Sequence, residues 1–103
     1  MRRTEAAVTP LERSAPADAD LDEILSYSRI RFGEDVAAEY YFSFDEAFSL
    51  LSRHPLAGAP ADDIRHGLRR ISHRQHRIFY RIVDDTVRIL RILHHAMDVD
   101  EHL

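Results

Sequence analysis

The chain has 103 residues, about the length of one ordinary domain, and we expect residues 1–103 to fold as a single domain. Its composition, 45% apolar and 31% charged with three glycines and four prolines, excludes a collagen-like or low-complexity protein. Cysteine is absent, which excludes disulfides and thiolate metal sites, and no apolar run approaches the roughly 18 residues of a membrane-spanning helix. We therefore expect a small soluble cytoplasmic protein without membrane association.

Charge is distributed unevenly along the chain. The net charge is −4, but residues 65–91 contain eight arginines against two aspartates, a local balance of +6. Residues 1–64 carry −7 and residues 92–103 carry −3. The basic block could bind a nucleic acid or an acidic protein segment, or its arginines could pair internally with the acidic half. All 14 basic residues are arginine, which excludes any function that needs a lysine side chain and suits phosphate and carboxylate partners.

Two amphipathic helices are predicted in the first half of the chain. An apolar stripe at helical spacing runs from residue 21 to 32, with Ser14 as a candidate N-cap and Gly33 as the stop signal. A second helix follows Gly33 and is closed by Pro55, so the two form an antiparallel hairpin. Its apolar positions are expected in the core, with one tyrosine exposed to a partner; they are Ala37, Tyr40, Tyr41, Phe44, Phe48 and Leu51.

Strands are predicted in the second half, after a loop at residues 56–65. Three segments rich in isoleucine and valine span residues 68–73, 76–83 and 86–94, and Asp84-Asp85 provides a hairpin turn between the last two. In the middle strand, alternation places Arg77, Phe79, Arg81 and Val83 on one face and Ile78, Tyr80 and Ile82 on the other.

The last strand has apolar residues on both faces and is therefore expected to be central in the sheet. Strict alternation would group Val87, Ile89, Arg91 and Leu93 on one face, and Arg88, Leu90, Ile92 and His94 on the other. Residues 8–13 could add an edge strand. The predicted fold is α+β, in the order β-α-α-β-β-β, with a helical hairpin packed on a small, mostly antiparallel sheet.

No metal site or cofactor is predicted. His73 and His76 are separated by two residues in a strand or turn, which does not place them on one helix face, and few carboxylates are near them.

Several segments, taken together, carry a family resemblance. They are ADADLDEILSY (17–27), RFGEDVAAEYY (31–41), HPLAG (54–58), DDIRHGLRRISHRQHRIFYRIVDD (62–85) and VRILRILHHAMDVDEHL (87–103). This ensemble resembles the RelE/ParE superfamily of toxins from bacterial type II toxin–antitoxin modules, in particular the ParE-like branch of plasmid stabilisation toxins. The resemblance covers nearly everything after residue 11. Residues 1–10 match nothing distinctive, and we expect an N-terminal extension there that is disordered or loosely attached.

The resemblance implies a partner and a target. The partner is a ParD-like antitoxin, a ribbon-helix-helix protein whose C-terminal tail wraps the toxin. The target of ParE-like members is DNA gyrase, whereas RelE-like and YoeB-like members cleave mRNA on the ribosome. A third possibility is a toxin fold that has lost toxicity and only binds an antitoxin.

The catalytic residues of the RelE-like and YoeB-like nucleases match this sequence only in part. The lysine-based RelE-like chemistry is excluded because the chain has no lysine. In the YoeB-like pattern, Arg70 occupies the position of the catalytic arginine and His94-His95 that of a His-Tyr pair, so His95 replaces the tyrosine. Only Asp62 and Asp63 lie near the position of the catalytic glutamate. We therefore favour gyrase inhibition by protein contact, without a catalytic residue.

The arginines of the basic block are the expected binding residues for the antitoxin or the target. Their guanidinium groups suit carboxylates of an acidic tail, with phosphate binding and internal pairing as alternatives. They are Arg69, Arg70, Arg77, Arg81 and Arg91.

Overall fold

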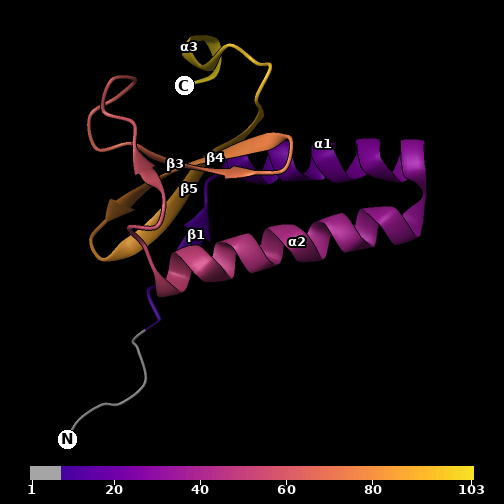
Figure 1. Cartoon of the computed structure of the whole chain (residues 1–103), viewed down its shortest axis with the longest axis horizontal. Coiled ribbons are helices and arrows are strands. Elements are labelled where there is room, and N and C mark those ends of the chain that lie inside the picture. Colours follow the sequence, from indigo (N-terminus) through magenta and orange to yellow (C-terminus); the bar gives the residue numbers. More distant parts are fainter. Residues whose placement is uncertain (1–7) are drawn as a thin grey trace, which may run out of the picture.

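The computed structural model describes residues 8–103 as a helical hairpin packed on a mixed sheet (Figure 1). The elements are β1 (Leu11–Arg13), α1 (Ala15–Phe32), α2 (Glu34–Arg53), β2 (Ala59–Pro60), β3 (Arg69–His73), β4 (His76–Val83), β5 (Thr86–His94) and α3 (Val99–His102). The five strands are ordered β1-β5-β4-β3-β2, with β1 parallel to β5 and the other pairs antiparallel. The α+β fold and the central place of β5 are confirmed.

Local signals place the helix ends where the sequence predicts them. Ser14 caps α1, because its Oγ accepts a hydrogen bond from the Ala17 N–H at 3.1 Å. Gly33 separates the helices with φ 94°, a left-handed value that favours glycine, and its N–H donates to the Arg29 carbonyl at 2.9 Å. α2 ends at Arg53, just before Pro55.

Both faces of the sheet carry an apolar cluster. The helix-facing cluster joins the helices to the sheet and contains Ala17, Leu21, Phe44, Phe48, Leu51, Ile78, Tyr80, Val87, Ile89 and Ile92. The second cluster lies on the outer face, where the loop before β3 and the α3 region cover it; it contains Ala61, Leu68, Phe79 and Leu93. The alternation predicted along β4 is therefore confirmed.

The prediction of strict alternation along β5 is wrong. Tyr80 pairs with Ile89 whereas Phe79 pairs with Arg91, so Leu90 is an extra residue in β5 and forms a β-bulge. Because of the bulge, the residues after Leu90 point to the opposite face from the one that strict alternation predicts. Ile92 therefore lies with Ile89 on the helix side, and Leu93 lies with Leu90 on the outer side.

Of the two tyrosines in the apolar stripe of α2, Tyr41 is the exposed one, at 43%, which agrees with the expectation of one exposed tyrosine. α2 has 20 residues and, with α1, extends well beyond the sheet (Figure 1). Apolar side chains near the tip of this hairpin have no strand beneath them, so helical spacing alone does not bury them.

Two short elements were not predicted. β2 forms inside the predicted loop, where Ala59 pairs with Arg70 and Pro60 lies at the sheet edge. Gly58 precedes it because the chain passes close to β3 and β4: a Cβ there would lie 2.6 Å from the Tyr80 Oη. α3 is a single turn near the end of the chain.

The remaining predictions for the ends and turns have mixed outcomes. Asp84 and Asp85 form the β4–β5 turn with φ values of 50° and 59°, as the hairpin prediction requires. The edge strand predicted within residues 8–13 is β1, and Thr9 donates its N–H to the Ser52 carbonyl at 2.9 Å. Residues 1–7 of the expected N-terminal extension lie outside the described residues.

Among the helices described, none is long and apolar enough to cross a membrane.

Candidate functional site

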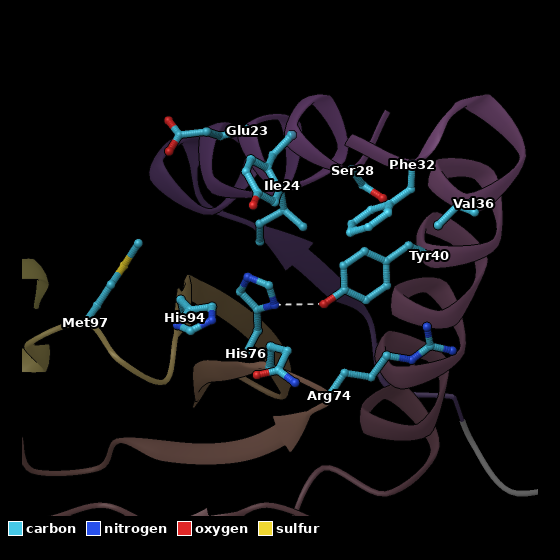
Figure 2. Close-up of a pocket in the computed structure, with 12 residues that line it drawn as sticks. Glu23, Ile24, Ser28, Phe32, Val36, Tyr40, Arg74, His76, His94 and Met97 are labelled. Carbon is cyan, nitrogen blue, oxygen red and sulfur yellow. Dashed lines mark hydrogen bonds between the residues drawn. The ribbon is translucent and has the colours of Figure 1, made fainter. Parts of the chain in front are cut away.

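A groove of about 830 Å³ lies between the helical hairpin, the β3–β4 turn and the end of β5 (Figure 2). Its lining is mainly apolar and comes from residues distant in sequence: Glu23, Ile24, Tyr27, Ser28, Phe32, Val36, Tyr40, Arg74, Gln75, His76, His94 and Met97. Glu23 and Arg74 lie on opposite sides of it (Figure 2). The groove was not predicted, because its walls meet only when the hairpin packs on the sheet.

Large apolar side chains of the hairpin are exposed along this groove. Tyr27 is 59% exposed, Phe32 61% and Val36 45%. A contiguous exposed apolar surface of this kind is typical of a site for a protein partner. The groove is therefore the first candidate binding surface.

A hydrogen-bonded network at the groove floor connects α2 to the β3–β4 hairpin. The Tyr40 Oη lies 2.8 Å from the His76 Nδ1, and the dashed line in Figure 2 marks this bond. Ser43 donates its only hydroxyl proton to the Tyr40 carbonyl at 2.7 Å, so its Oγ accepts from the His73 Nε2–H at 2.8 Å. The Arg74 guanidinium lies 5.3 Å from the centre of the Tyr40 ring. The network holds the groove floor in one geometry.

Burial keeps the histidines of this network neutral. It lowers the pKa of His76 from 6.5 to about 4, helped by the neighbouring imidazoles of His94, His73 and His95, while Asp20 opposes the shift. The pKa of His73 is lowered as well, by burial and then by Arg74.

Acid is expected to destabilise the fold through His76. Its ring is neutral in both states above about pH 6.5, but between pH 6.5 and 4 the unfolded chain binds more protons than the folded chain. Stability is therefore lost as the pH falls, by about 1–2 kcal/mol for this partly exposed ring. Urea unfolding of wild type and of His76→Gln between pH 7 and 4 measures the difference: the variant should lose less.

His66→Gln is the matched control, because the His66 side chain is fully exposed. It should follow the wild-type pH profile. If the stability of His76→Gln depended on pH as that of wild type does, the assignment of the acid-dependent loss of stability to His76 would be contradicted.

The structure separates Arg70 from the other two nuclease candidates, His94 and His95. His94 lies in the groove, with its ring 5.4 Å from that of His76, and its Nδ1 accepts the Ala96 N–H at 3.1 Å. His95 follows it and is exposed, with its ring 4.7 Å from that of His94. Arg70 pairs with Phe79 across β3 and β4, so its side chain is on the outer face of the sheet, away from the groove.

Of the five expected binding arginines, Arg70, Arg77 and Arg81 share the outer face. Arg77 pairs with Leu93 across β4 and β5, and Arg81 donates to the His66 carbonyl at 2.8 Å. Among residues 8–103, neither Arg70 nor Arg77 forms an ion pair. Both are half-buried on that face.

The other two arginines are bound within the chain. Arg69 faces the helix side and donates to the carbonyls of Leu56 at 3.1 Å and Gly58 at 2.6 Å. Arg91 donates both Nε and Nη2 to the Asp20 carboxylate at 2.8 Å, which raises the pKa of Arg91. Contact of any of the five with a partner stays a prediction.

Residues 8–103 contain no cluster of three or more histidine, aspartate or glutamate side chains that could hold a metal ion. The prediction of no metal and no cofactor concerns the whole chain and stays a prediction.

A helical hairpin on a sheet of this topology also occurs in chains of two solved toxin–antitoxin systems. A chain of the chromosomal ParDE toxin–antitoxin system from P. aeruginosa superposes with a TM-score of 0.74 at 22% identity, over 85% of this chain and 97% of that one. A chain of the RelBE2 toxin–antitoxin complex from Mycobacterium tuberculosis gives a TM-score of 0.57 at 31% identity, over 85% and 99% of the two chains.

Sequence comparison identifies the toxin family to which the chain belongs. Residues 11–99 match the family described as the ParE toxin of the type II toxin–antitoxin system parDE. Toxin ParE1 of Caulobacter vibrioides is 38% identical over 94 residues, 91% of this chain and 97% of the relative. Toxin ParE1 of Mycobacterium tuberculosis is 36% identical over 91 residues, 87% and 93% of the two chains. The chain belongs to the ParE toxin family, which confirms the resemblance to the ParE-like branch.

Proposed function

We propose that this ParE-family toxin is held inactive by a ParD-like antitoxin and, when free, inhibits DNA gyrase by protein–protein contact and so stops replication. The observation that carries this proposal is the separation of Arg70 from His94 by the sheet. A phosphodiester bound beside one of these side chains would not be reached by the other, so they do not form one catalytic site. Contact surfaces are instead the features that the fold presents.

The antitoxin would use two of these surfaces. The groove offers exposed apolar side chains for the apolar anchors of a tail, and the outer face offers guanidinium groups for its carboxylates. Such a division suits a tail that is both apolar and acidic.

Charge reversal on the outer face tests this arrangement. Arg77→Glu combined with Arg81→Glu should weaken antitoxin binding by about 10–100-fold at low salt, since carboxylates would then meet like charge. The variant should lose less affinity in high salt than wild type, because salt screens a repulsion instead of an attraction. Titration calorimetry with the cognate antitoxin at two salt concentrations provides the measurement.

Arg29→Glu with Arg53→Glu is the matched control for charge reversal, because these arginines lie on the helices and not on the sheet. The control should bind with near-wild-type affinity. Equal affinities for the wild-type and outer-face variants would place the tail elsewhere.

The nuclease alternative keeps one favourable feature, the adjacent rings of His94 and His95. Against it, the His94 Nδ1 already accepts the Ala96 N–H, so only its Nε2 is open to another group. Asp62, one of the two carboxylates near the expected glutamate position, is used within its own loop: its Oδ1 accepts the Gly67 N–H at 2.8 Å.

Alanine substitutions separate the two activities. If the toxin acts on gyrase, His94→Ala should leave inhibition of DNA supercoiling within about threefold of wild type, because no bond is made or broken by the toxin. If it cleaves mRNA, Arg70→Ala and His94→Ala should each abolish ribosome-dependent cleavage. Loss of gyrase inhibition by His94→Ala with unchanged thermal stability would count against the proposal.

The decisive experiment induces the chain alone in bacteria and pulse-labels DNA and protein within minutes. Early arrest of DNA synthesis, with translation continuing, is the expected result. Early arrest of translation would overturn the gyrase target and support the nuclease. If neither process stops, the toxic activity is lost in that host and only antitoxin binding remains.

A further inference from the structure

The groove between the helical hairpin and the sheet carries one acidic and one basic side chain on opposite walls. Glu23 lies on α1 and Arg74 on the β3–β4 turn, on the two sides of the groove (Figure 2). Both residues are exposed, and among residues 8–103 neither forms an ion pair. Each charge is therefore open to an opposite charge on a second molecule.

Arg74 is held in place at the rim of the groove. It lies in the two-residue turn between β3 and β4, with a left-handed φ of 55°, where His73 pairs with His76. Its guanidinium lies 5.3 Å from the centre of the Tyr40 ring, and the Tyr40 hydroxyl is hydrogen-bonded to His76. Because the guanidinium is already positioned, it loses little further freedom when a carboxylate binds to it.

The surface between these two charges is apolar. Ile24, Tyr27 and Phe32 line the groove from α1, and Val36 and Tyr40 line it from α2 at a spacing of four residues. Within residues 8–103 no segment covers Tyr27 or Phe32, since more than half of each is exposed. An exposed apolar surface between two unlike charges favours association with a complementary surface.

We propose that the groove is the interface of a symmetric homodimer, in which a second copy of this chain covers it while no antitoxin is bound. A two-fold axis that crosses the groove midway between Glu23 and Arg74 brings Glu23 of each copy opposite Arg74 of the other. The same rotation packs the apolar surface of one groove against that of the other. One self-complementary surface thus supplies two ion pairs and an apolar centre.

The dimer and the antitoxin would use the same groove. We place the apolar anchors of the antitoxin tail there, so the two copies must separate before these anchors bind. The outer face of the sheet, which carries Arg70 and Arg77, lies away from the groove and stays open in the dimer. Self-association goes beyond the proposed function, because it requires neither the antitoxin nor gyrase.

Reversal of either charge tests the two-fold pairing. Sedimentation velocity of the free full-length chain measures the dissociation constant of the dimer, which we expect in the micromolar range. Glu23→Arg and Arg74→Glu should each weaken dimerisation by about 10–100-fold, since each brings like charges together at both pairs. Both positions are exposed, so both variants should fold as wild type does. A wild-type chain that stays monomeric well above micromolar concentration would overturn the proposal.

An equimolar mixture of Glu23→Arg and Arg74→Glu should recover the dimer to within about threefold of the wild-type affinity. In the mixed dimer the two basic side chains of one variant meet the two acidic side chains of the other, so both ion pairs form again. The combined variant Glu23→Arg/Arg74→Glu should likewise dimerise as wild type does. A mixture that stays monomeric would exclude the two-fold pairing.

Asp22→Arg and Arg53→Glu are the matched controls for charge reversal, because both residues are exposed and neither lines the groove. Each should dimerise with near-wild-type affinity. Losses as large as those of Glu23→Arg and Arg74→Glu would show that net charge, and not the groove, controls association.

The apolar part of the interface has its own pair of variants. Phe32→Ser should weaken dimerisation by at least about tenfold, because it removes an aromatic side chain from the centre of the interface. Ile30→Ser removes a side chain that is 81% exposed and does not line the groove, and it should have no such effect. Equal losses for the two variants would overturn the groove as the interface. None of these measurements includes antitoxin or gyrase, so failure of the proposed function leaves their result intact.

Discussion

Asp20→Asn is expected to lower the free energy of unfolding by about 3 kcal/mol, because it leaves a largely buried guanidinium without its counter-charge. The Asp20 and Arg91 side chains are 14% and 23% exposed, and two bonds of 2.8 Å join them. The Asp20 Oδ2 also accepts the Ile92 N–H at 2.9 Å, next to the bulge in β5. One carboxylate therefore fixes α1 on the central strand.

Asp18→Asn is the control for Asp20→Asn. Asp18 pairs with Arg13 at 2.6 Å, but these side chains are 54% and 35% exposed, so the loss should be no more than about 1 kcal/mol. Chemical denaturation of the three proteins at pH 7 measures the difference. Similar losses for the two variants would show that the Asp20–Arg91 pair is no stronger than a surface ion pair.

Tyr80→Phe is expected to cost about 2–3 kcal/mol, because it leaves two backbone groups without hydrogen-bond partners. The Tyr80 side chain is fully buried, its Oη accepts the Gly58 N–H at 2.9 Å, and it donates to the Pro55 carbonyl at 2.7 Å. This hydroxyl ties the segment between α2 and β2 to the sheet.

Tyr41→Phe removes a hydroxyl from a tyrosine that is 43% exposed, and it should change stability by no more than about 0.5 kcal/mol. Thermal unfolding of the two variants compares the hydroxyls directly, with a shift of several degrees expected only for Tyr80→Phe. A shift below one degree for Tyr80→Phe would mean that water or a rearranged loop satisfies the Gly58 and Pro55 groups.

Part of the candidate site follows from alternation along strands. Arg77 and Arg81 were placed together on one face, and the outer cluster around Phe79 confirms that face. Arg69 and Arg70 are neighbours in β3 and therefore point to opposite faces, which divides the expected binding set. Phe44 and Phe48 of α2 are buried in the core as expected, and Tyr40 packs against that core. The bond of the Tyr40 hydroxyl to His76 at the groove floor was not predicted.

The sequence by itself determined the elements whose ends depend on neighbouring residues. Ser14, Gly33 and the Asp84-Asp85 turn act on adjacent backbone, so the helical hairpin and the last β-hairpin were predicted within a residue or two. The family resemblance was likewise contained in the order and spacing of residues.

Only the tertiary structure decided the features that join distant segments. Arg91 and Asp20 are 71 residues apart, and the groove joins both helices to the ends of two strands. The bulge at Leu90, the short β2 and the docking of α3 have no local periodicity that predicts them. They form because packing must satisfy buried charges and cover apolar surface, and which surfaces meet is set by the folded chain as a whole.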